Sequence, residues 1–220
     1  MTRRTKRLLD VVGALALLIA TSPLLALAAA AVWATMGRPI LFRQTRTGLH
    51  GRIFTLFKLR TMVAAGGGDL AGNREVRIAG NRDVRIADDA MRLTPLGRWL
   101  RASSLDELPQ LVNILRGDMS LVGPRPLLPA YLARYSAEQA RRHEVPPGLT
   151  GLTQVRGRNG LSWEEKFALD VEYVDRWSLR LDAWILWRTL VTVVRRDGVA
   201  ADGHATMPEF LGSRSGGGLR

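Results

Sequence analysis

Cysteine is absent from this 220-residue chain. Its absence excludes disulfide bonds and thiolate chemistry, and it agrees with a reducing, cytoplasmic compartment. Lysine is scarce too, because only three of the 32 basic residues are lysines, which leaves 29 arginines. Long apolar runs are also few: a single one is present, from Val11 to Trp33.

The arginines give the chain a formal net charge of +12 at pH 7. The planar fork of a guanidinium group suits phosphate. Three kinds of partner fit such a charge: nucleic acid, an anionic membrane surface, or a phosphate-bearing substrate. Codon bias in a GC-rich genome is the competing explanation for any single exposed arginine.

Length limits the number of domains. With 46% hydrophobic residues the chain can bury one core, and the part that follows the apolar run has the length of a single domain. A second catalytic domain is therefore not expected.

The apolar run is long enough to cross a bilayer, but Ser22 and Pro23 interrupt it. Pro23 removes a helix hydrogen bond and Ser22 can bind a freed carbonyl, so we expect a sharp bend there. Basic residues flank both ends of the run: Arg3, Arg4, Lys6, Arg7, Arg38, Arg43, Arg46 and Arg52. A re-entrant helix that returns to the same face keeps both clusters on one side. A bitopic span and a cleaved signal peptide are the alternatives.

The next segment, Ile40 to Met62, has β-branched and alternating stretches separated by glycine turns, which predicts two short strands in a hairpin. A glycine run at 66–68 then precedes two nearly identical octapeptides, 73–80 and 81–88. They predict either a second hairpin or an insertion tolerated in a surface loop. No chemistry is assigned to them.

Apolar spacing over 100–115 predicts a helix with Pro109 in its first turn. Asp106 and Glu107 are therefore expected at the helix N-terminus, where free N–H groups favour carboxylates and phosphate alike. Simple helix capping is the competing interpretation.

Two glycine- and proline-rich segments follow this helix. The first, 117–126, holds Arg125 between two prolines and can present it rigidly to a phosphate. The second, 146–159, combines glycines that allow close backbone approach with further arginines, among them Arg158. His143 is expected to be structural rather than catalytic.

Four blocks now carry a resemblance: KLRTM at 58–62, SLDELPQ at 104–110, GDMSLVGPRP at 117–126 and PGLTGLTQV at 147–155. In this order they resemble the bacterial sugar transferase family, the monotopic phosphoglycosyl transferases, from about Lys6 to about Gly198. Residues 157–170 and the tail around Gly203 and His204 resemble its small members of glycoprotein and N-acetylated-sugar pathways.

The resemblance implies transfer of a phosphosugar from a UDP-sugar to polyprenyl (undecaprenyl) phosphate, with Mg²⁺, giving polyprenyl diphosphate sugar and UMP. Asp106 would be the nucleophile that forms an aspartyl phosphosugar, and Glu107 would assist with metal or proton handling. A covalent intermediate divides a difficult step into two. Asp106 is also the candidate metal ligand, and the sequence does not decide between the two roles.

The same resemblance implies a re-entrant helix bent at Ser22 and Pro23. It also implies that phosphates or nucleotide are bound by Lys58, Arg60, Arg101, Arg125 and Arg158. A surface arginine, or a lysine reaching along an interface, is the competing interpretation for each of them.

Amphipathic helices are expected in the C-terminal third. Ser162 and Glu165 form a capping-box pattern ahead of an apolar stripe. A second segment, 183–194, is too short to span a bilayer, so it is core or interfacial. Four of the six tryptophans lie between 163 and 187, which suits a headgroup belt or core packing.

The predicted fold is α+β and membrane-associated. A re-entrant helix-break-helix (1–36) precedes a small catalytic domain with short strands and interfacial amphipathic helices (37–198), in which 64–92 is a variable loop. A partly disordered extension (199–220) follows. The inner membrane is the expected location, with the catalytic domain facing the cytoplasm, and no nucleic-acid partner is expected.

Two functional alternatives stay open: a non-catalytic polybasic membrane adaptor, and a glycosyltransferase that releases UDP. The adaptor leaves the acid pair and the Pro-Arg-Pro loop unexplained. The nucleotide product distinguishes the two enzymes, because the glycosyltransferase would release UDP and the phosphosugar transferase UMP. The sugar and the oligomeric state, a homodimer included, are not determined by the sequence.

Overall fold

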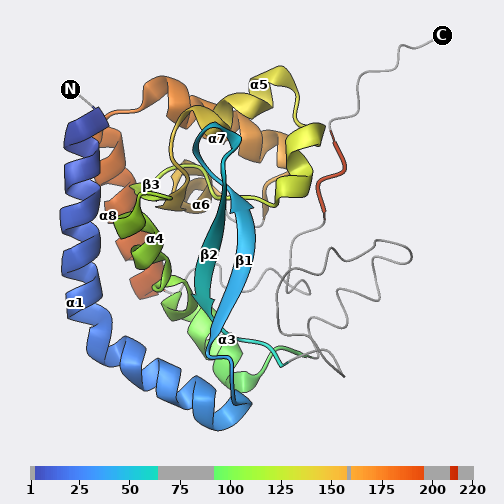
Figure 1. The fold of residues 1–220 in the computed structure, drawn as a ribbon. Coiled ribbons are helices and arrows are strands. Elements are labelled where there is room, and N and C mark those ends of the chain that lie inside the picture. Colours follow the sequence, from blue (N-terminus) through green and yellow to red (C-terminus); the bar gives the residue numbers. More distant parts are fainter. Residues whose placement is uncertain (1–2, 64–91, 158–159, 196–208, 213–220) are drawn as a thin grey trace.

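A computed structural model of the chain describes residues 3–63, 92–157, 160–195 and 209–212 (Figure 1). The helices are α1 (Arg3–Met36), α3 (Pro95–Ala102), α4 (Gln110–Arg116), α5 (Ala137–Ala140), α6 (Leu152–Arg156), α7 (Trp163–Arg176) and α8 (Leu179–Arg195). The 3₁₀ turns are η1 (Leu49–Gly51), η2 (Leu105–Glu107), η3 (Pro129–Arg134) and η4 (Arg141–Glu144). The strands are β1 (Leu41–Thr47), β2 (Ile53–Leu59), β3 (Ser120–Val122) and β4 (Gly148–Thr150). The octapeptides at 73–88, the glycines at 66–68, Arg158 and the pair Gly203 and His204 lie outside the described residues.

The apolar run forms most of α1, a continuous helix of 34 residues with Pro23 inside it. Figure 1 shows its axis running past α8 and α4 and then turning toward α3. Lys6, Asp10 and Ala14 are buried and lie four residues apart, so they form one stripe that faces the rest of the protein. The mixed α+β fold and the bend are as predicted, although the helix is bent rather than broken.

The predicted hairpin is confirmed, because β1 and β2 pair antiparallel from Leu41 opposite Leu59 to Thr47 opposite Ile53. His50 and Gly51 adopt the left-handed conformation in the connection (φ 52° and 75°), which reverses the chain between the strands. The hairpin places Lys58 near the end of β2.

A second sheet is formed by β3 and β4, which pair parallel. A Cβ atom on Gly148 would lie 2.0 Å from the backbone nitrogen of Gly123. The glycines of this region therefore permit the close approach that the sequence indicated, but the partner at Gly148 is the protein's own backbone.

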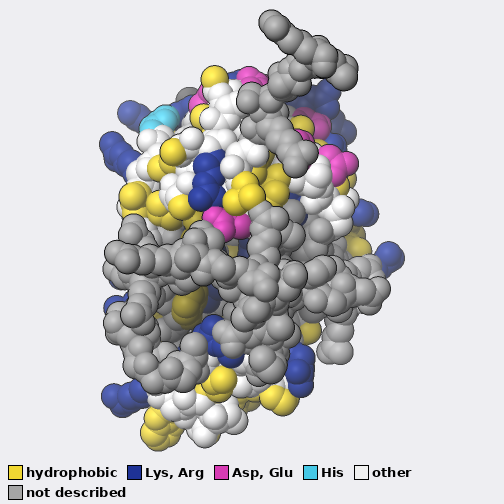
Figure 2. All heavy atoms as spheres, turned by 90° about the vertical axis from the view of Figure 1, so that its right-hand side faces the viewer, with side chains coloured by type: hydrophobic (Ala, Val, Ile, Leu, Met, Phe, Trp, Pro, Cys, Tyr) yellow, Lys and Arg dark blue, Asp and Glu magenta, His cyan; other side chains and the backbone are white. Residues whose placement is uncertain are grey.

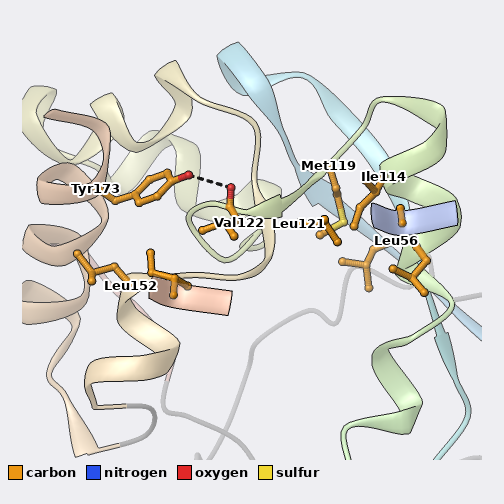
Figure 3. Packing of buried hydrophobic residues seen from close by; sticks show 10 residues of the cluster. Leu56, Ile114, Met119, Leu121, Val122, Leu152 and Tyr173 are labelled. Atoms are coloured by element: carbon orange, nitrogen blue, oxygen red, sulfur yellow. Dashed lines mark hydrogen bonds between the residues drawn. The ribbon is translucent and has the colours of Figure 1, made fainter. Parts of the chain in front are cut away.

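The main hydrophobic core joins α1, β2, α4, β3, α6, α7 and α8. Its buried residues are Ala14, Leu56, Leu111, Ile114, Met119, Leu121, Val122, Leu152, Tyr173 and Ile185. Figure 3 shows the Tyr173 hydroxyl pointing at the Val122 carbonyl oxygen, to which it donates at 3.0 Å. A smaller cluster of Ala28, Val32, Leu59 and Leu100 joins the second half of α1 to β2 and α3.

The C-terminal helices agree with the sequence in part. The Ser162 capping box is present at the start of α7. Helix α8 begins at Leu179, four residues before the predicted start, and the Ser178 carbonyl accepts from the Asp182 N–H within its first turn. Trp163 packs in an aromatic cluster, as core packing predicts, whereas Trp187 is 63% exposed. The headgroup belt stays a prediction.

The aromatic cluster includes a residue from the predicted tail. Phe210 is 2% exposed and contacts Tyr131, Tyr135, Trp163 and Phe167. Arg134 forms an ion pair with the adjacent Glu209 at 2.7 Å. Within the described part of the C-terminal extension, Glu209 and Phe210 are therefore packed against the domain, whereas Leu211 is exposed.

Candidate active site

Asp106 and Glu107 lie in the 3₁₀ turn η2, between α3 and α4. Ser104 adopts the left-handed conformation (φ 57°), which ends α3 and starts this turn. The prediction that both acids begin the following helix is wrong by one turn, because α4 starts at Gln110. Pro109 has no N–H with which to continue α-helical bonding back to Leu105, so a 3₁₀ turn precedes the helix.

Glu107 is the meeting point of two cations. Its Oε1 accepts from Lys58 Nζ at 2.5 Å and from an Arg125 guanidinium nitrogen at 2.7 Å. Burial opposes ionisation of this carboxyl, but Arg125 and Lys58 together hold its pKa well below its usual range. Glu107 is therefore ionised at neutral pH and balances part of the positive charge around it.

Asp106 differs from its neighbour. Its side chain is buried, with 6% of the residue exposed, and among the described residues it takes part in no hydrogen bond or ion pair. Burial, and then the charge of Glu107, raise the pKa of Asp106 to about 6, although Lys58, Arg101 and Arg125 act in the opposite direction. The two adjacent acids thus have unequal proton affinities, the condition for giving two carboxyls different chemical tasks.

Asn113 connects the strand that carries Lys58 to the helix behind the acids. Its side-chain amide donates to the Thr55 carbonyl at 2.7 Å and accepts from the Phe57 N–H at 3.2 Å. Because Asn113 lies fully buried on α4, it fixes β2 relative to α4. This contact holds Lys58 at the distance at which it binds Glu107.

The Pro-Arg-Pro loop is held from behind by a buried ion pair. Arg142 bonds Asp170 Oδ2 at 2.7 Å and donates to the Arg125 carbonyl oxygen at 2.7 Å. Thr153, from the PGLTGLTQV block, donates to the other oxygen of Asp170 at 2.7 Å. The bond from Arg142 thus anchors the backbone of Arg125. The side chain of Arg125 is 47% exposed, and its guanidinium reaches Glu107.

The other predicted cations differ in position. Arg101 lies close enough to Asp106 to affect its pKa, and its Nε donates to Thr61 at 3.1 Å. Arg60 instead binds the carbonyl oxygens of Met36, Gly37 and Arg38, just at and beyond the end of α1. The structure thus gathers Lys58, Arg101 and Arg125 around the acids and assigns Arg60 to the end of α1.

His143 is buried, and its Nδ1 lies 3.2 Å from the Gly48 carbonyl oxygen. Burial, with the neighbouring Arg142, lowers its pKa to about 4, so the ring is neutral at physiological pH. This placement agrees with the structural role that the sequence indicated.

Three residues of this region were not selected from the sequence as site residues. Arg142 and Asp170 are 28 positions apart, and no local pattern joins them. In the sequence Arg46 is one of the basic residues after the apolar run; in the fold it bonds the Pro126 carbonyl and lies near Arg125 and Glu107. Its position within the predicted hairpin is the one signal that the sequence offers.

Figure 2 views the side that lies to the right in Figure 1, where acidic and basic side chains lie next to one another among hydrophobic ones. A cavity of about 540 Å³ lies elsewhere, along α5 and α7, and the acid pair is not part of its lining.

The donor set of the acid pair suits magnesium. Among the described residues no group of three or more His, Cys, Asp or Glu side chains could hold a metal ion. Mg²⁺ is commonly bound through one or two carboxylates, with water and substrate phosphates completing its shell. Asp106 and Glu107 fit that pattern in number and type.

Fold and site together define an α+β protein with a bent apolar N-terminal helix and an acid pair among cations, an arrangement suited to anionic substrates. The model of the bacterial sugar transferase family matches residues 1–196. The chain belongs to the bacterial sugar transferase family, and it is a sugar-phosphate transferase.

Individual relatives agree with this assignment. An uncharacterized sugar transferase EpsL of Bacillus subtilis is 48% identical over 94% of this chain and 96% of its own length. The UDP-glucose:undecaprenyl-phosphate glucose-1-phosphate transferase of Caulobacter vibrioides is 46% identical over 87% of this chain and 70% of its own length. The undecaprenyl-phosphate galactose phosphotransferase of Salmonella typhimurium is 39% identical over 90% of this chain but only 42% of its own length.

Proposed function

We propose that this protein transfers a phosphosugar from a UDP-sugar to undecaprenyl phosphate, giving undecaprenyl diphosphate sugar and UMP. Relatives whose names state undecaprenyl-phosphate sugar phosphotransferase activity support the general reaction. The observation that carries the proposal is the unequal acid pair: Glu107 bound by Lys58 and Arg125, and Asp106 buried beside it without a bonded partner among the described residues.

Asp106 is the nucleophile in this proposal. A carboxylate whose pKa lies near 6 is ionised at pH 7.5, yet it is more basic, and therefore more nucleophilic, than an ordinary aspartate. Glu107 is the weaker nucleophile, because Arg125 and Lys58 bind its Oε1 and hold its pKa well below its usual range. Its role is to hold Lys58 and Arg125 beside the reacting phosphates.

The reaction proceeds in two displacements. An oxygen of Asp106 attacks the β-phosphorus of the UDP-sugar, and the bond from that phosphorus to the bridging oxygen breaks, so UMP leaves with the electron pair. A phosphate oxygen of the lipid then attacks the same phosphorus, and the bond to Asp106 breaks, which restores the carboxylate. UMP departs before the lipid attacks, which reduces crowding of anions: two unit charges about 4 Å apart repel by about 4 kcal/mol at an effective dielectric of 20.

Magnesium is the proposed cofactor, with Asp106 and Glu107 as the residues that would hold it. When bound, it neutralises charge on the diphosphate as a Lewis acid. Lys58, Arg101 and Arg125 supply further positive charge beside the acids, which would also offset the negative charge of the diphosphate.

We also propose that α1 lies in the inner membrane as a re-entrant helix, with the catalytic domain facing the cytoplasm. Among the described residues α1 is the helix long and apolar enough to cross a membrane, and only 11% of its most apolar window is buried. Large apolar side chains exposed on its outer face include Leu8, Leu9, Val12, Ile19 and Leu27. On α8, Trp184, Trp187 and Leu190 are exposed as well and suit the headgroup region.

The test is nucleotide release by detergent-purified protein supplied with undecaprenyl phosphate, Mg²⁺ and each of a panel of UDP-sugars. We expect UMP from one or a few sugars, and no release by Asp106→Asn. The matched control is Asp175→Asn, which removes an exposed aspartate of α7 paired with Arg141 and should keep full activity.

Omitting the lipid separates the two displacements. With a covalent intermediate, wild-type protein releases UMP in a burst of at most one equivalent, and the phosphosugar stays on the protein. Release of UDP in place of UMP would identify a glycosyltransferase instead. UMP release that strictly requires the lipid would contradict the two-step path while leaving the overall reaction intact.

A further inference from the structure

Arg46, one residue before the end of β1, is a cation for which the reaction proposed above has no role. Its guanidinium is held in place by protein acceptors, since one terminal nitrogen donates to Gln44 Oε1 at 2.5 Å and the other to the Pro126 carbonyl at 3.3 Å. Within the described part of the chain it forms no ion pair with a carboxylate, and its Nε is buried without a hydrogen-bond partner. The protein therefore orients this guanidinium without neutralising it.

The charge around Arg46 is unbalanced. Its electrostatic neighbours are Arg125, which repels it, and Glu107, which attracts it. Glu107 already bonds Lys58 and Arg125, so three cations share this one carboxylate. Burial, followed by the repulsion from Arg125, lowers the pKa of Arg46 to about 10, which still leaves it charged at neutral pH. A bound anion would relieve both the desolvation and the repulsion.

The position of Arg46 indicates which anion this is. Lys58, Arg101 and Arg125 influence the pKa of Asp106, whereas the Arg46 guanidinium donates to the Pro126 carbonyl of the Pro-Arg-Pro loop at 3.3 Å. Arg46 also adjoins Tyr131 and Tyr135, beside the aromatic cluster. Arg46 is therefore fixed to the loop that carries Arg125, and among the described residues no hydrogen bond or ion pair ties it to the acid pair.

The opposite end of the site adjoins the apolar helix. Leu59 and Leu100, which directly neighbour Lys58 and Arg101 in sequence, pack against Ala28 and Val32 of α1. A lipid phosphate that arrives along α1 reaches this end first. The site thus has one end at Lys58 and Arg101, next to α1, and another at Arg46, next to the Pro-Arg-Pro loop.

We propose that Arg46 binds the nucleotide phosphate of the UDP-sugar, the phosphate that leaves with UMP, through charge-assisted hydrogen bonds. The inference rests on the proposed function and adds a direction to it: nucleotide at the β1 end, phosphosugar at Asp106, lipid phosphate at the α1 end. Arg46 is a binding residue here, and its removal should affect the nucleotide rather than the lipid.

The test measures binding of UMP and of uridine to full-length protein in detergent by calorimetry, with uridine followed by competition if it binds weakly. Arg46→Gln should weaken UMP about tenfold or more, since one charge-assisted contact is lost, and should leave uridine unchanged. Arg46→Lys keeps the charge but lacks the planar guanidinium. Its affinity for UMP should lie between those of Arg46→Gln and the wild type. The matched control is Arg52→Gln, an exposed arginine of the same hairpin, which should bind UMP like wild type.

Steady-state kinetics supply a second readout. Arg46→Gln should raise KM for the UDP-sugar and leave KM for undecaprenyl phosphate within about twofold of wild type. Equal losses for UMP and uridine, or an equal rise in both KM values, would overturn the inference in favour of a structural role. If Arg46→Gln does not fold, Arg46→Lys decides the question. The inference would also be overturned if Arg46→Lys bound UMP with wild-type affinity and the salt dependence of that binding were unchanged.

Different results would contradict the proposed function and the role of Arg46. Wild-type protein that binds no UMP and releases none would contradict the phosphosugar transfer itself. Wild-type protein that binds and releases UMP, with unchanged affinity in Arg46→Gln, contradicts only the role of Arg46.

Discussion

Ser22 donates its hydroxyl to the carbonyl oxygen of Ile19 at 2.8 Å. In an uninterrupted helix that carbonyl would accept from the N–H of residue 23, but residue 23 is proline and has none. The neighbouring Thr21 hydroxyl likewise donates to the Leu17 carbonyl at 2.7 Å. Because the Ser22 hydroxyl replaces the missing N–H of Pro23, the Ile19 carbonyl stays paired at the bend. This matters in a bilayer, where an unpaired backbone group costs several kcal/mol.

The first prediction concerns the topology of α1. Because the chain has no cysteine, the single-cysteine variants Arg4→Cys and Arg43→Cys can be labelled without background. Both should react with a membrane-impermeant maleimide from the cytoplasmic side, and neither from the periplasmic side. Labelling of the two positions from opposite sides would establish a bitopic helix.

Pro23→Ala, added to Arg4→Cys, tests the bend itself. Restoring the backbone hydrogen bond straightens the helix, so a measurable fraction of position 4 should become reactive from the periplasmic side. Ser22→Ala, which removes only the bond to Ile19, is the milder comparison and should keep position 4 cytoplasmic.

The second prediction is that Asp106→Asn inactivates the enzyme and stabilises the fold. The pKa of Asp106 is raised from 3.8 to about 6, so its contribution to stability is fully present below about pH 3.8 and is lost as the pH rises through 6. At pH 7.5 the substitution should raise the free energy of unfolding by up to about 3 kcal/mol.

Denaturant unfolding at pH 7.5 and pH 4.5 checks this, and the gain should be much smaller at pH 4.5, where folded Asp106 is already protonated. A loss of stability at both pH values would show that the ionised carboxylate is held by favourable contacts instead.

The third prediction concerns pH dependence. UMP release by the wild-type protein should fall as the pH drops through about 6, because protonated Asp106 does not attack. Glu107→Gln removes the negative charge that, after burial, raises the pKa of Asp106, so the acidic limb of its residual activity should move to lower pH. A limb that stays near 6 would show that burial alone sets this pKa.

Glu107→Gln should also lower the free energy of unfolding by about 1–3 kcal/mol, since Lys58 and Arg125 lose their shared acceptor. Glu138→Gln is the control, because Glu138 pairs with Arg141 at an exposed position away from the acids. It should change neither stability nor the pH profile appreciably.

The fourth prediction concerns the attachment of α1. Asp182 of α8 accepts from Lys6 at 2.6 Å and from the Tyr173 hydroxyl at 2.7 Å, and all three residues are buried. Asp182→Asn leaves the Lys6 charge without its close partner and should cost about 3 kcal/mol of stability. Asp175→Asn breaks an exposed pair and should cost less than about 1 kcal/mol. Thermal unfolding compares the two variants, and equal losses would contradict the importance of the buried pair.

The basic flank before the apolar run shows where sequence reasoning reached its limit. In the sequence, Lys6 and Arg7 are two charges of a basic cluster that a re-entrant helix keeps on the same side as the second cluster. In the structure Lys6 is buried against Asp182, and Arg7 donates to the Ile114 and Leu115 carbonyls at the end of α4. Partners more than 100 residues away are invisible to a local charge count.

The cations of the site divide in the same way. Lys58, Arg101 and Arg125 were selected because they stand in recognisable motifs, and the fold brings them to Asp106. Arg60 stands in the same motif as Lys58 but binds carbonyl oxygens at the end of α1. It lies one residue beyond the end of β2 at Leu59, so strand alternation, which would place it on the face of Lys58, no longer applies. Arg46 carried no motif of its own and is placed beside Arg125 only by strand pairing and the Pro-Arg-Pro loop.

The sequence by itself determined what depends on local chemistry and on motifs: the bend at Pro23, the hairpin, the capping box of α7, the acid pair and the family. Tertiary structure alone decided how charge is shared among these parts. The raised pKa of Asp106 and the double pairing of Glu107 arise from burial and from cations contributed by separate elements. Burial and long-range charge are properties of the packed chain, because the residues that create them are distant in sequence.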